Sequence, residues 1–199
     1  PWDSGLVKQS LQDSWEGEFS ILDLQLGSAC NAHCRHCDSS CSSLHESANL
    51  DINEVVRLLG EMRQSRNYFS PEHQSEPLWC FICGLGEPTE PTENLPKLLE
   101  LLDRTAEIGV NFALFNNGLY WDEKLNKHLG GGRLSVQVQV MSNQVEKVAH
   151  FMGVSKDEAN LQLRHREQIY EVAVQQWDHP QAANGTNVCA SIVPMRDNL

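Results

Sequence analysis

Residues 21–37 read ILDLQLGSACNAHCRHC, and this stretch determines the fold that we expect. Its first six residues alternate apolar and polar side chains, which is typical of a strand with one buried face. Three cysteines, Cys30, Cys34 and Cys37, follow directly in the spacing C-x3-C-x2-C. The sequence therefore predicts a strand over 21–26 that leads into a loop carrying three thiols.

The same succession of strand, loop and helix repeats along the rest of the chain. Further strands are predicted at 78–83, 110–115, 134–140 and 187–193, and amphipathic helices around 51–62, 95–102, 122–129 and 156–177. Asp51 is the expected N-cap of the first helix, and residues 141–155 are expected to be less regular. Because no hairpin turn separates neighbouring strands, we expect an α/β protein with a parallel sheet, either doubly wound or part of a βα barrel.

Polar or glycine-rich segments follow each of the first three predicted strands. They are the cysteine loop, the turn Gly-Leu-Gly-Glu-Pro at 84–88 and the turn Asn-Asn-Gly at 116–118. In both candidate folds the carboxyl ends of the parallel strands carry the ligand site. We therefore expect these segments to meet at one edge of the sheet. For each turn taken alone, a plain βα connection that needs glycine is the alternative.

Composition and charge limit the possible partners. The 199 residues are 40% hydrophobic and 21% charged, which is ordinary for one globular domain, with 1–20 as an N-terminal extension and 21–199 as the core. A net charge of −12 disfavours a nucleic-acid partner. No apolar run suits a membrane span, and a cytoplasmic location is expected. The chain begins with Pro1 instead of methionine, so a lost targeting segment stays open.

The clustering of the cysteines indicates a metal site. Disulfide frameworks spread their cysteines, whereas tight clusters in a chain of cytosolic type more often bind metal. Three thiolates can hold three irons of a cubane cluster and leave the fourth iron open. Counting Cys41 as well, the alternatives are a fully ligated electron-transfer cluster or a closed zinc site. Cys80 and Cys83 lie within an apolar strand, where residues three apart face opposite ways, and are expected to be core thiols. For Cys83, at the strand end, an approach to the site stays open.

The C-x3-C-x2-C spacing just after a first strand resembles the signature of the radical S-adenosylmethionine (radical SAM) superfamily. In that family three cysteines bind a 4Fe-4S cluster, and SAM chelates the fourth iron. The resemblance implies that Cys30, Cys34 and Cys37 are iron ligands, and that the chain folds as a partial (β/α)6 TIM-like half-barrel with parallel strands. Since the chain stops after its fifth predicted strand, the sixth unit and any C-terminal domain are expected to be missing from it.

Other segments resemble the parts of that family that bind SAM. The turn from Gly84 to Pro88 is similar to the Gly-Gly-Glu-Pro motif, whose backbone contacts the methionyl amino group, although Leu85 replaces a glycine. The Asn-Asn-Gly turn is similar to a Thr-Asn-Gly turn of many members. The resemblance implies SAM contacts from the following residues: His36, Gly84, Gly86, Glu87, Pro88, Asn116, Gln137, Gln139, and Arg164 or Arg166.

The implied chemistry belongs to the cofactors. A reduced cluster passes one electron into SAM and yields methionine and a 5′-deoxyadenosyl radical, which abstracts hydrogen from the substrate. A peptide or a small natural product is the expected substrate, and a flavodoxin or ferredoxin the expected type of reductant. No separate nucleophile or triad is indicated. The alternative is a non-catalytic iron–sulfur or zinc-binding protein that serves interaction or electron transfer.

Overall fold

The computed structural model describes residues 22–37, 50–69, 77–83, 85–177 and 188–192. Within these ranges five strands form one sheet, every neighbouring pair is parallel, and the strand order follows the chain. The strands are β1 (Asp23–Leu24), β2 (Leu78–Ile82), β3 (Val110–Asn116), β4 (Leu134–Val140) and β5 (Val188–Ile192). The predicted parallel α/β sheet is therefore confirmed.

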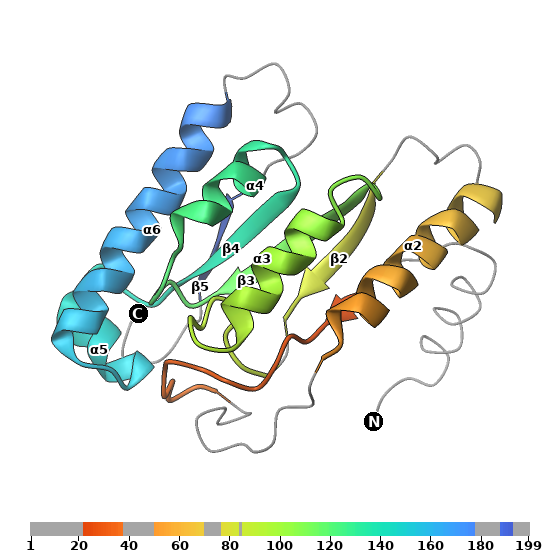
Figure 1. The fold of residues 1–199 in the computed structure, drawn as a ribbon. Coiled ribbons are helices and arrows are strands. Elements are labelled where there is room, and N and C mark those ends of the chain that lie inside the picture. The colour runs from red at the N-terminus through yellow and green to blue at the C-terminus, as the bar shows by residue number, and fades with distance from the viewer. Residues whose placement is uncertain (1–21, 38–49, 70–76, 84, 178–187, 193–199) are drawn as a thin grey trace, which may run out of the picture.

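The helices identify which of the two expected sheet types is present. They are α2 (Ile52–Phe69), α3 (Asn94–Arg104), a 3-10 turn η3 (Glu123–Leu125) that runs into α4 (Asn126–Gly130), α5 (Val145–Met152) and α6 (Lys156–Trp177). Figure 1 shows α2, α3 and α4 in front of the same face of the sheet. A doubly wound sheet reverses its strand order and carries helices on both faces. The sequential order here is that of a βα barrel, not of a doubly wound sheet.

The hydrophobic core lies between this sheet face and the helices. Leu98 and Leu101 of α3 and Phe112 and Leu114 of β3 are fully buried there. Strand alternation points Cys80 into the same core, as predicted. The prediction of a core thiol is wrong for Cys83, which is half-buried on the opposite face, where its thiol donates to Asp23 Oδ1 (3.7 Å). Burial raises the pKa of the Cys80 thiol to about 12, as expected for a core thiol.

Local details differ from the prediction in two places. Residues 141–155 are not irregular, because they contain the two-turn helix α5. The strand predicted at 21–26 pairs with β2 only at 23–24. The first helix begins as predicted, since the Asp51 carboxylate accepts a hydrogen bond from the backbone N–H of Asn53 (2.9 Å).

Several expectations concern residues outside the described ranges. These are the N-terminal extension at 1–20, Cys41, Gly84, and the segment after the fifth strand. Among the helices that the structure describes, none combines the length and the apolar character needed to cross a bilayer.

Candidate functional site

The three cysteines lie on the loop that follows β1, at the carboxyl edge of the sheet. All three are thiols and all three are half-buried. Cys30 and Cys34 pack against a second apolar cluster, separate from the main core, whose buried members are Ala32, Leu119, Met141, Val148, Phe151, Met152 and Ala159. Apolar side chains therefore shield one side of Cys30 and Cys34 from solvent, as the apolar shell of a metal site does.

Helix α5 holds the middle of the cysteine loop. The backbone N–H groups of His33 and Arg35 donate to the carbonyls of Met152 (2.8 Å) and Phe151 (2.9 Å), at the end of that helix. Gly153 ends α5 in the left-handed conformation, with φ of 64°, and a Cβ there would lie 2.6 Å from the His33 carbonyl oxygen. A helix that the sequence analysis missed thus fixes the backbone between the first and third cysteines.

Two side-chain contacts join the same loop to neighbouring strands. Gln139, near the end of β4, makes a hydrogen bond with His36, whose Nε2 lies 2.6 Å from Nε2 of the amide. Asn117, in the turn after β3, donates from Nδ2 to Oδ1 of Asn31 (2.9 Å). The structure therefore brings the cysteine loop, the Asn-Asn-Gly turn and the end of β4 together, as the sequence predicts.

The turn at 85–88 packs against the start of the cysteine loop. Gly86 has a φ of 89°, and a Cβ on it would lie 2.5 Å from the Gly27 carbonyl oxygen and 2.7 Å from that of Ala29. The Glu87 N–H donates to the Ala29 carbonyl (2.8 Å). Glycine at position 86 is thus required by backbone that leads into Cys30.

Glu87 is buried, with 4% of its surface exposed. Its side chain faces other segments at the carboxyl edge of the sheet, and we call these segments together the rim. The carboxylate accepts hydrogen bonds from the backbone N–H of Asn117 (2.8 Å), from Asn116 Nδ2 (3.0 Å) and from the Thr89 hydroxyl (2.9 Å). Burial raises the pKa of Glu87 to about 7, although the hydrogen bonds from Asn117 and Thr89 oppose that shift. The predicted SAM contacts Glu87 and Asn116 are therefore bonded to each other beneath the rim.

The raised pKa of Glu87 predicts how stability depends on pH. Because the folded chain keeps this proton to a higher pH than the unfolded chain, the free energy of unfolding falls as pH rises from 4.5 to about 7. The contribution of this one residue is up to about 3 kcal/mol. Urea denaturation at about pH 5 and about pH 8 should show this loss in the wild type and a smaller one in Glu87→Gln.

Glu90 provides the control for this measurement. Burial opposes its ionisation, but hydrogen bonds from Thr92, Glu93 and Asn94 outweigh burial and lower the pKa of this carboxyl. Glu90→Gln should therefore keep the wild-type slope above pH 4.5. An identical slope in Glu87→Gln and wild type would contradict the assignment to Glu87.

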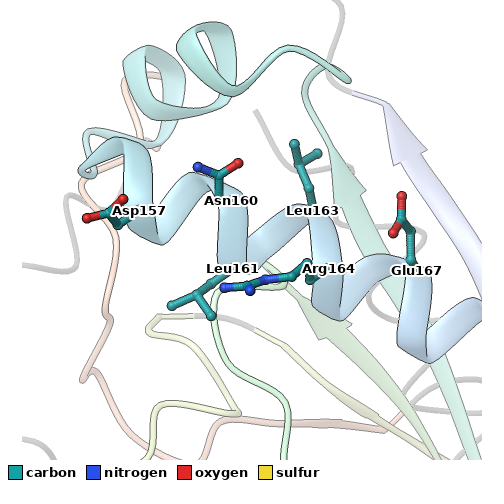
Figure 2. A pocket seen from close by; sticks show the side chains of 6 residues that line it. All are labelled: Asp157, Asn160, Leu161, Leu163, Arg164 and Glu167. Carbon is teal, nitrogen blue, oxygen red and sulfur yellow. The ribbon is translucent and has the colours of Figure 1, made fainter.

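The remaining predicted SAM contacts lie at three different places. Gln137 is half-buried on the sheet face opposite the helices, level with Phe115 of β3. Arg166 donates to the Ser142 carbonyl (3.2 Å) and to Oδ1 of Asn143 (2.8 Å), in the segment after β4. Arg164 is exposed on another side of α6 and lines an open hollow of about 520 Å³, where it lies between Leu161 and Glu167 in Figure 2.

Two buried amides that the sequence analysis missed complete the rim. Asn94, at the start of α3, donates from Nδ2 to the carbonyls of Ala29 (3.0 Å) and Glu87 (2.9 Å). Gln162 of α6 donates from Nε2 to the carbonyls of Asn117 (3.2 Å) and Gln139 (3.0 Å). The sequence did contain a signal for Gln162. It is a polar residue on the buried face of an amphipathic helix, three residues after the buried Ala159.

The donor set fits an iron–sulfur cluster. Within the described ranges, no three side chains of His, Cys, Asp or Glu converge closely enough to hold a single metal ion. A cubane cluster makes a different demand, because its irons are bound by separate thiolates. Three cysteines on one loop, of which Cys30 and Cys34 are backed by apolar side chains, would provide that chemistry as soft thiolate ligands.

A sequential parallel βα sheet with a three-cysteine loop after its first strand is the arrangement expected of radical SAM enzymes. The fold is similar to that of SuiB from Streptococcus suis bound to the precursor peptide SuiA (TM-score 0.55, 17% identity), over 84% of this chain and 35% of that one. For SuiB bound to S-adenosylmethionine the TM-score is 0.54 at 16% identity, with 84% and 34% covered. The expected resemblance to radical SAM enzymes is thus confirmed in the fold.

This chain spans about a third of the length of SuiB. No protein-family model and no curated protein sequence matches it.

Proposed function

We propose that this chain is the cofactor-binding core of a radical SAM enzyme in which Cys30, Cys34 and Cys37 bind a 4Fe-4S cluster. The observation that carries the proposal is the position of these three thiols, together on one loop at the carboxyl edge of a sheet with the fold of SuiB. When bound, the cluster supplies the electron that cleaves SAM into methionine and a 5′-deoxyadenosyl radical, which takes a hydrogen atom from the substrate.

The chain's own residues have three tasks in this proposal. The three cysteines bind iron, and the apolar cluster behind Cys30 and Cys34 keeps water from one side of the site. Asn117 and Gln139 hold the loop through Asn31 and His36. A cluster held by these residues would lie at the carboxyl edge of the sheet.

We place the substrate over the sheet face opposite the helices. This face carries Phe81 and Phe115, whose ring centres are 6.3 Å apart, and Gln137 beside Phe115. Aromatic rings and amides bind both the side chains and the backbone of a peptide. A peptide is therefore the first substrate class to test, and the complex of SuiB with its precursor peptide supports that choice. A small natural product is the second class, and a flavodoxin or ferredoxin is the proposed reductant.

Anaerobic reconstitution with iron and sulfide tests the proposal. We expect about four irons and about four sulfides per chain, and 5′-deoxyadenosine after addition of SAM and dithionite. The experiment uses the longest natural chain that contains these residues, so that truncation exposes no strand edge of the sheet. A protein that takes up zinc, or a cluster that neither binds SAM nor yields 5′-deoxyadenosine, would support the non-catalytic metal-binding alternative.

A further inference from the structure

Cys30 lies between two residues that Glu87 holds, one through its backbone N–H and the other through its buried carboxylate and Asn117. On one side, the Ala29 carbonyl accepts hydrogen bonds from the Glu87 N–H (2.8 Å) and from Nδ2 of Asn94 (3.0 Å). On the other side, Asn31 accepts from the side chain of Asn117 (2.9 Å), whose own backbone N–H donates to the Glu87 carboxylate (2.8 Å). Both neighbours of the first cysteine thus depend on one residue.

Three of the four groups around the carboxylate of Glu87 can only donate hydrogen bonds, and the fourth, the Thr89 hydroxyl, can donate its one hydrogen either to Glu87 or to the Tyr120 carbonyl (3.0 Å). The four groups are the N–H and hydroxyl of Thr89, Nδ2 of Asn116 and the N–H of Asn117, at 2.8 to 3.2 Å. An ionised carboxylate is acceptor-only and satisfies all four. A neutral amide of the same shape offers one acceptor oxygen and turns an NH2 group toward other donors, which leaves buried groups without a partner.

We propose that Glu87 is a positioning residue that sets the place of Cys30, and through it the geometry of the cluster and of SAM. This inference rests on the proposed function, in which Cys30 is an iron ligand. The N–H, the C=O and the carboxylate of Glu87 all make hydrogen bonds to other protein groups. Its backbone N–H acts through Ala29, and its carboxylate, which Glu87→Gln changes, acts through Asn117.

Glu87→Gln tests the proposal in the reconstituted protein. We expect iron content close to wild type, a changed electron paramagnetic resonance spectrum of the reduced cluster, and SAM affinity lowered by about tenfold, the size expected when a hydrogen bond to a charged group is lost. A lower free energy of unfolding does not by itself alter the electron paramagnetic resonance spectrum of the cluster in molecules that remain folded. The spectrum therefore separates positioning from a general structural effect.

Glu90→Gln is the matched control. Glu90 belongs to the same loop, and its carboxylate accepts from Thr92 and Glu93 at 2.6 to 3.0 Å, all within that loop. Its loss should weaken the start of α3 and leave the cluster spectrum and the SAM affinity as in wild type. A Glu90→Gln spectrum changed as much as that of Glu87→Gln would overturn the inference.

Asn31→Ala provides a second test, independent of how Glu87→Gln folds. Asn31 is half-buried, and the substitution removes the outer hydrogen bond without touching the buried carboxylate. We expect a smaller spectral change in the same direction and weaker SAM binding. Wild-type spectra and affinities in both variants, with the wild type itself loaded and active, would overturn the positioning role alone. A wild type that takes up no cluster would instead overturn the proposed function and this inference with it.

Discussion

Cys34→Ala is expected to reduce the iron content of the reconstituted protein to background and to abolish production of 5′-deoxyadenosine. Cys34 is the middle thiol of the loop, and the adjacent backbone, at His33 and Arg35, is held by the end of α5. The loop therefore cannot shift to bring another side chain into its place. Iron and sulfide analysis, the absorption spectrum and product chromatography measure the effect. Cys30→Ala and Cys37→Ala should behave alike.

Cys83→Ala is the matched control for these substitutions. Cys83 is half-buried like the three loop thiols and lies at the end of the neighbouring strand, but it bonds to Asp23 on the open sheet face. Its replacement should leave the iron content unchanged. Cys41→Ala should also be tolerated. If Cys41→Ala removed as much iron as Cys34→Ala, a closed, fully ligated cluster would be the better account of the site.

Gly86→Ala is expected to destabilise the chain by about 3 kcal/mol or more, because it combines a left-handed backbone with a steric clash. The added Cβ would lie 2.5 and 2.7 Å from the carbonyl oxygens of Gly27 and Ala29, which are backbone atoms with no rotamer to change. Relief requires the turn to separate from the cysteine loop. Iron binding should therefore fall together with stability, as measured by urea denaturation and iron analysis on the same samples.

Gly60→Ala is the control for glycine replacement as such. Gly60 lies within α2, and a Cβ there would meet no atom within 4 Å. Alanine favours the helix by about 0.5–1 kcal/mol over glycine, so this variant should be slightly more stable and bind iron normally. Wild-type stability in Gly86→Ala would mean that the turn has room that the structure does not show.

Much of the fold followed from local patterns in the sequence. The strands β2, β3 and β4 lie within a residue of their predicted bounds, because β2 and β3 are short, mostly apolar runs and β4 alternates apolar and polar residues. Helix α5 also left a signal, since Val148 and Met152 are four residues apart and Gly153 follows. Its eight residues are short enough to be taken for a loop. The choice between barrel and doubly wound sheet needed the strand order, which no local pattern encodes.

The site was predicted in its parts but not in its connections. The three cysteines and the two turns are adjacent because strand ends meet at one edge, and that follows from topology. The role of Glu87 could not be predicted in this way. Its partners Asn116 and Asn117 are about 30 residues away in the chain, and their hydrogen bonds depend on the register between β2 and β3. The family resemblance drew attention to the Gly86–Glu87 backbone, whereas the structure gives the Glu87 side chain a role in holding the rim.

The contact between α5 and the cysteine loop has a consequence for synthesis of the protein. The carbonyls that fix His33 and Arg35 belong to residues 151 and 152, so the loop emerges from the ribosome about 120 residues before its support does. At about 5–20 residues per second, the thiols wait roughly 6–24 s without their final backbone hydrogen bonds. During that time they are reactive groups on an unfinished chain, open to oxidation or to the wrong metal. If the proposed function holds, iron would be loaded after α5 has docked.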